Sequence, residues 1–98
     1  MSNDGKMGAY VARGVRARRV WLGLGQVEVA RRLGCSGQTV SAIERGIRKV
    51  TVDDLPGLCR ALDTTFAALV NGADPDDVRA VGLDVQAGSA PRRRASAP

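Results

Sequence analysis

Residues 25–46 read GQVEVARRLGCSGQTVSAIERG, and this stretch decides the fold. Its first half spaces apolar residues as one face of a helix does, until Gly-Cys-Ser-Gly at 34–37 interrupts the pattern. A second helical pattern follows, and its outward positions are small and polar: Gln38, Thr39, Ser41 and Ala42. A helix with so little to bury on that side indicates a face that contacts something other than the protein's own core.

The two helices expected here are short and are joined by a tight turn. An inward apolar stripe that ends at Leu33 precedes Gly34, which stops the first helix. Ser36 is a suitable N-cap for the second helix, and Val40 and Ile43 are its inward residues. A glycine-containing turn of three or four residues between two helices is typical of the helix-turn-helix motif.

The whole chain predicts an all-α protein, a compact bundle of five short helices with a short sixth helix. We expect a first helix over 9–22, a fourth from Asp53 or Asp54, a fifth capped by Thr65, and a sixth from Asp74 to about residue 81. The chain then divides into a flexible leader (1–8), a helix-turn-helix domain (9–72), a short acidic C-terminal helix or extension (73–85) and a disordered basic tail (86–98).

The net charge of +5 is unevenly distributed along the 98 residues. Residues 11–49 hold nine Arg and Lys against two Glu, a balance of +7, whereas residues 50–90 hold two Arg against seven Asp, a balance of −5. A surface built only for solubility would mix its signs. The segregation therefore indicates that the basic half meets a polyanion, such as a nucleic acid.

Other classes of function find little support in the composition. The chain has two cysteines and no histidine, which argues against a zinc site, and both Cys35 and Cys59 are expected to be small buried residues in a reducing compartment. We expect no metal, no cofactor and no enzymatic activity, because no phosphate loop or metal-ligand cluster is present. No signal core or membrane span is expected, so a soluble, cytoplasmic protein is predicted.

The residues quoted above also carry a family resemblance. Residues 22–46, LGLGQVEVARRLGCSGQTVSAIERG, resemble the helix-turn-helix of XRE-type proteins, the phage repressor and Cro family, and the similarity continues more weakly through LPGLCRALDTTFAALV. The resemblance implies a lambda-repressor-like fold that binds double-stranded DNA. Asp63 departs from the family pattern, because it stands where a glycine normally turns the chain, although aspartate tolerates that conformation.

The chemistry of the open helix face and the resemblance together assign site residues. An amide can recognise adenine and a small apolar side chain can contact a thymine methyl, which fits Gln38 and Ala42. The expected base-contacting residues are Gly37, Gln38, Ser41 and Ala42. The expected phosphate-contacting residues are Gln26, Thr39, Arg45, Arg48 and Lys49. The resemblance further implies a structural ion pair, Arg19 with Glu44, and a dimer interface that contains Phe66, Leu69 and Val70.

These assignments predict a sequence-specific transcriptional regulator, most simply a repressor that binds a near-palindromic operator as a homodimer at the nucleoid. The alternative is an antitoxin-like or adaptor protein whose acidic C-terminal half binds a protein partner. At single positions two interpretations also stay open. Gln38 either contacts a base or is simply an exposed helix residue. The arginines at 13, 16 and 18 either form a solvated helix face or add contacts to DNA. Trp21 either covers the edge of the domain or marks a surface for a partner.

Overall fold

A computed structural model describes residues 6–83 of the chain, and every element in that range is helical. The elements, in order, are α1 (Lys6–Trp21), α2 (Gln26–Leu33), α3 (Gly37–Glu44), the 3-10 turn η1 (Val52–Asp54), α4 (Leu55–Leu62), α5 (Phe66–Leu69) and α6 (Pro75–Ala80). The all-α prediction, the helix-turn-helix and the sixth helix are thus confirmed. The predicted tail, 86–98, lies outside the described residues, as do residues 1–5 of the predicted leader.

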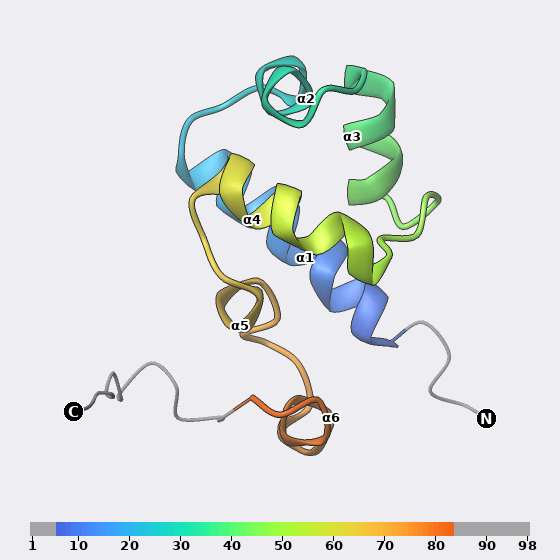
Figure 1. Cartoon of the computed structure of the whole chain (residues 1–98), viewed down its shortest axis with the longest axis vertical. Coiled ribbons are helices and arrows are strands. Elements are labelled where there is room, and N and C mark those ends of the chain that lie inside the picture. The colour runs from blue at the N-terminus through green and yellow to red at the C-terminus, as the bar shows by residue number, and fades with distance from the viewer. Residues whose placement is uncertain (1–5, 84–98) are drawn as a thin grey trace.

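The helices form two ends around a central pair. Helices α1 and α4 pack against each other in the middle of the molecule, α2 and α3 lie together at one end, and α5 and α6 lie at the other (Figure 1). Helix α1 is the common support, because it contacts α3, α4 and α5. The motif and the C-terminal helices therefore occupy opposite ends of one scaffold.

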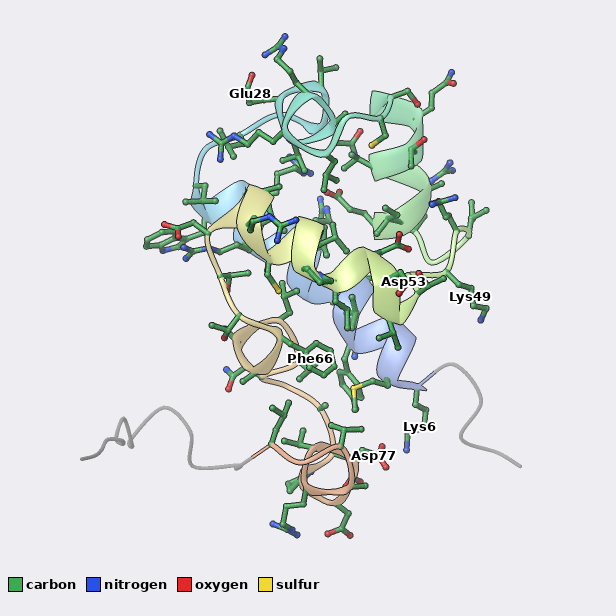
Figure 2. All side chains as sticks on the ribbon, in the orientation of Figure 1. Lys6, Glu28, Lys49, Asp53, Phe66 and Asp77 are labelled. Carbon is green, nitrogen blue, oxygen red and sulfur yellow. The ribbon has the colours of Figure 1, made fainter. Side chains whose placement is uncertain are left out.

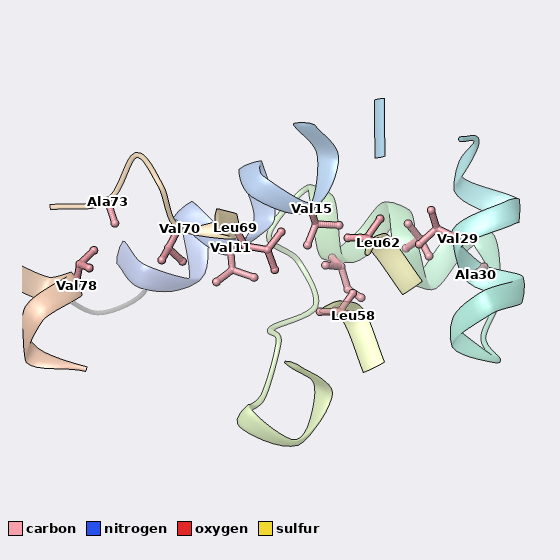
Figure 3. Packing of buried hydrophobic residues seen from close by; sticks show 12 residues of the cluster. Val11, Val15, Val29, Ala30, Leu58, Leu62, Leu69, Val70, Ala73 and Val78 are labelled. Carbon is pink, nitrogen blue, oxygen red and sulfur yellow. The ribbon is translucent and has the colours of Figure 1, made fainter. Parts of the chain in front are cut away.

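The core is aliphatic, as the scarcity of aromatic residues predicts. Val15, Val29, Leu58 and Leu62 are at most 2% exposed and lie where α1, α2 and α4 meet. The buried side chains continue as one line from α2 through α1 to α6 (Figure 3). Each large aliphatic side chain buried in this way stabilises the fold by roughly 1.5–3 kcal/mol.

Side-chain caps and left-handed residues set most helix boundaries. Ser36, Thr65 and Asp74 each accept a backbone N–H of the helix that they precede, as predicted. Asp63 ends α4 with φ of 51°, which confirms that aspartate takes the place of the usual glycine. The first helix begins at Lys6, three residues before the predicted start, so residues 6–8 are helical rather than part of a leader.

The two cysteines are less buried than predicted. Cys35 is exposed, because it lies in the turn between α2 and α3, and Cys59 is half-buried on α4. Leu69 and Val70 are only 4% and 1% exposed, because both belong to the core of this same chain. Of the three predicted dimer residues, Phe66 alone keeps a partly exposed side chain in the single chain, and the dimer interface itself stays a prediction.

Candidate nucleic-acid interface

The turn between α2 and α3 is fixed by its own backbone. Gly34 takes a left-handed conformation with φ of 78°, and the N–H of Cys35 donates to the carbonyl of Ala30 at 2.9 Å. Two residues on, the Ser36 hydroxyl oxygen accepts the N–H of Thr39 at 3.2 Å and starts α3. These turn contacts therefore fix the direction of α3 relative to α2.

Helix α3 has one buried face and one open face. Val40 and Ile43 point into the core and are 1% and 6% exposed. Gln38 is exposed, and Ser41 and Ala42 are half-buried. Because residues 38, 41 and 42 are spaced i, i+3 and i+4, they share one side of the helix, and the protein's described residues leave that side accessible.

Gly37, the first residue of α3, lies close to Val27 of α2. A Cβ atom at this position would lie 3.3 Å from Cγ2 of Val27, which is tighter than ordinary contact. Val27 is itself 65% exposed at the start of α2. The sequence pattern did not single out Val27, yet the structure places this apolar side chain beside the first turn of the open helix.

The predicted phosphate-contacting residues fall into two groups. Arg45, Arg48 and Lys49 are exposed and lie in the connection that follows α3, with Lys49 at the edge of the molecule (Figure 2). Thr39 is half-buried, and its hydroxyl lies 3.1 Å from that of Ser36. Three exposed cationic side chains therefore follow the C-terminal end of α3, whereas the hydroxyl of Thr39 lies against the capping residue Ser36.

The ion pair between Arg19 and Glu44 is present, as predicted. Nε of Arg19 donates to Oε2 of Glu44 at 2.6 Å and Nη2 donates to Oε1 at 3.0 Å, while the two side chains are only 13% and 3% exposed. Nη1 of Arg19 also donates to the carbonyl of Leu24 at 2.9 Å. The hydrogen bond to Glu44, aided by its charge, raises the pKa of Arg19.

Gln26 belongs to the same network, which sequence reasoning missed. Its Nε2 donates to Oε1 of Glu44 at 3.1 Å. The carboxylate of Glu44 on α3 thus holds both the guanidinium of α1 and the first side chain of α2. The network fixes the three helices relative to one another behind the open face.

One interpretation of the sequence placed Arg18 on a solvated helix face, and the structure contradicts it. Its Nε donates to the carbonyl of Leu62 at 2.9 Å and its Nη2 to that of Asp63 at 2.7 Å. Arg32 similarly donates to the carbonyl of Ala61 at 2.9 Å. Two arginines from different helices therefore cap the C-terminus of α4, where the helix dipole favours positive charge.

A tight two-helix turn, an open polar helix face and a flanking cationic loop together define a helix-turn-helix DNA-binding protein of the regulator class. The sequence model of the helix-turn-helix domain family matches residues 11–72, more than half of the 98 residues. The chain belongs to this family.

Three solved structures illustrate the similarity. The restriction-modification controller protein C.AhdI from Aeromonas hydrophila is 29% identical, with a TM-score of 0.58 over 63% of this chain and 94% of that one. The clp gene regulator ClgR from C. glutamicum is 25% identical, with a TM-score of 0.62 over 65% and 82%. The hypothetical transcription factor NHTF from Neisseria is 27% identical, with a TM-score of 0.61 over 76% and 84%.

Two further properties concern only the part of the chain that the structure describes. Between residues 6 and 83, no group of three or more His, Cys, Asp or Glu side chains is placed to hold a metal ion. Over the same range, no helix combines the length and the apolar character that a membrane crossing needs.

Proposed function

We propose that this protein is a sequence-specific regulator of transcription, a repressor that binds a near-palindromic DNA operator as a homodimer in the cytoplasm, at the nucleoid. The observation that carries the proposal is the open polar face of α3, which the cationic side chains of Arg45, Arg48 and Lys49 flank. The similarity to a restriction-modification controller and to a clp gene regulator, at 29% and 25% identity, supports a regulatory role.

In this proposal α3 enters the major groove. Gln38 hydrogen-bonds an adenine through its amide, and Ala42 lies against a thymine methyl, with Gly37 and Ser41 close to the bases. Helix α2 crosses the backbone, and its N-terminus at Gln26 faces a phosphate. The hydrogen bond from Gln26 to Glu44 supports this role, because it limits the rotamers of an amide whose second N–H is left for the phosphate.

Phosphate contacts come from the loop that follows α3. Arg45, Arg48 and Lys49 neutralise phosphates beside the C-terminal end of the reading helix, with Thr39 as a neutral contact. Each neutralised phosphate releases counterions, so the affinity falls as salt rises. Two copies of α3 about 34 Å apart would read two half-sites, and an occupied operator excludes other proteins from the same DNA.

Two substitutions test the proposal after the wild-type protein has selected duplexes from a random pool. Gln38→Ala is expected to cost about 1–3 kcal/mol on the selected duplex and to relax one base preference. Arg48→Ala is expected to weaken all duplexes alike and to reduce the salt slope by about one. Arg79→Ala, an equal charge loss on α6 at the opposite end, is the control (Figure 1). If Gln38→Ala left the discrimination between selected and random duplexes unchanged, the proposed reading face would be wrong.

A further inference from the structure

A groove of about 550 Å³ lies between α1 and α5, away from the helices of the motif. On the α1 side it is lined by Tyr10, Arg13, Ala17, Arg18 and Trp21, and Asn71 and Gly72, which follow α5, also line it. Trp21 is 74% exposed, which makes it one of the largest apolar surfaces on the described part of the chain. Nothing in the proposed contact with DNA uses this groove.

The groove combines positive charge with aromatic faces. The guanidinium carbon of Arg13 lies 4.7 Å from the ring centre of Tyr10, and that of Arg18 lies 4.6 Å from the ring of Trp21. Among the described residues that line the groove, none is acidic. Its chemistry therefore suits an acidic segment that also brings apolar groups.

The chain itself has an acidic segment, α6, which is followed by Val81, an apolar residue that is 53% exposed. Helix α6 and its cap carry Asp74, Asp76 and Asp77 against Arg79, a net charge of −2. The side chain of Asp76 is 86% exposed and forms an ion pair with Nη2 of Arg79 at 2.6 Å on the same helix. Val78 is only 8% exposed and anchors α6 to the core of its own chain, whereas Asp74 and Asp76 are exposed and Asp77 is half-buried. Helix α6 also lies outside the segment that the family shares, residues 11–72.

We propose that the groove of one chain receives α6 of a second copy, and that the contact is reciprocal. Gly72, which lines the groove, is only three residues from Pro75, where α6 begins. A two-fold axis close to Gly72 would place each α6 opposite the groove of the other copy, as in an isologous dimer. The C-terminal tail of the chain is excluded as the occupant, because Arg92, Arg93 and Arg94 would meet two more arginines.

This inference rests on the proposed function in one respect: it supplies the interface that an operator-binding homodimer needs. The proposed interface is this groove and not Leu69 and Val70, which are buried in the core of their own chain. Sedimentation equilibrium of the full chain, without DNA, measures the self-association. Arg13→Glu and Asp76→Lys are each expected to weaken the dimer at least about tenfold. The double variant, in which the two charges are exchanged, is expected to recover most of the affinity.

Trp21 supplies a second readout, because it is the single tryptophan of the chain. Its emission is expected to shift to shorter wavelength as the wild type associates with rising concentration, and to stay unshifted in Arg13→Glu. Arg16→Glu makes the same charge change on the exposed surface of α1 outside the groove, and it is expected to associate as the wild type does. Circular dichroism checks that each variant is folded.

Three results would overturn the inference. They are a chain that stays monomeric at every concentration, a dimer that Arg13→Glu and Arg16→Glu weaken equally, and association without any change at Trp21. A fourth result would also overturn it: binding of a short random duplex that Arg13→Glu abolishes and Gln38→Ala leaves intact. That result would make nucleic acid the occupant of the groove. The sedimentation experiment is done without DNA, so it tests the dimer alone. If the chain associates as described but selects no duplex, only the proposed function is contradicted.

Discussion

The two ends of the molecule are held together by different forces. At the α2–α3 end, the charges of Arg19 and Glu44 and the amide of Gln26 tie three helices together. The α5–α6 end is held by apolar packing instead. Val70 and Val78 belong to the core there, and Gly14 of α1 lies close to Leu69 of α5. A helix that keeps one face open for DNA has little apolar surface left to bury, so a polar network behind it takes over the task.

The largest effect is expected from breaking the polar network. Glu44→Ala leaves the guanidinium of Arg19, 13% exposed, without its partner, and is expected to lower the free energy of unfolding by about 3 kcal/mol or more. Urea unfolding measures the loss. Glu28→Ala, which breaks an exposed pair with Arg31, is the control and is expected to cost less than about 1 kcal/mol. Equal losses in the two variants would contradict the comparison.

A smaller effect is expected from disturbing the packed end. A Cβ at Gly14 would clash with the carbonyl oxygen of Leu69, so α5 must move in Gly14→Ala. The clash is expected to cost about 1–3 kcal/mol, which outweighs the gain of up to about 1 kcal/mol in helix propensity. Gly8→Ala on the same helix has no neighbour within 4 Å of the added atom and is expected to be neutral or stabilising. Thermal unfolding of the two variants decides between these outcomes.

A matched pair of helix caps, one at each end, separates stability from function. Ser36→Ala and Thr65→Ala each remove a cap that accepts a backbone N–H, at 3.2 and 3.1 Å, and each is expected to cost about 1 kcal/mol of stability. Only Ser36→Ala is expected to weaken binding to a selected duplex, because Ser36 begins the reading helix. Equal losses of DNA affinity in both variants would show that the two ends are not independent.

The smallest effect concerns the link between the two ends. Hydrogen bonds from Thr51 lower the pKa of Asp54 in η1. Because the folded-state pKa is depressed, the contribution of Asp54 to stability is complete above about pH 4 and is lost as the pH falls through the folded-state pKa. The stability difference between wild type and Asp54→Asn is thus expected to shrink in acid. Asp53→Asn, the neighbouring exposed acid, serves as the control.

The α2–α3 end was well predicted from the sequence. The helix boundaries at Gly34 and Ser36, the buried Val40 and Ile43, and the ion pair of Arg19 follow from turn residues, helical spacing and a fixed family pattern. The hydrogen bond of Gln26 was missed, because a polar residue at a helix start is equally compatible with solvent, a phosphate or a neighbouring carboxylate. The DNA contacts themselves stay predictions.

The α5–α6 end was harder to predict for a physical reason. Helical spacing shows that Leu69 and Val70 are apolar on one side, but it does not show whether that side meets the chain's own core or a second chain. Here α6 packs nearby and Val78 joins the same core. Likewise, the apolar character of Cys35 suggested burial, yet its place in a two-helix turn leaves it exposed.

The exposed thiol of Cys35 has a practical consequence. The second cysteine, Cys59, is half-buried, and burial raises the pKa of its thiol, so it is the slower of the two to form a reactive thiolate. A maleimide dye is therefore expected to label the wild-type chain first at Cys35. The label would be attached within a few residues of Gln38, where its emission can report the approach of a duplex without any engineered attachment point.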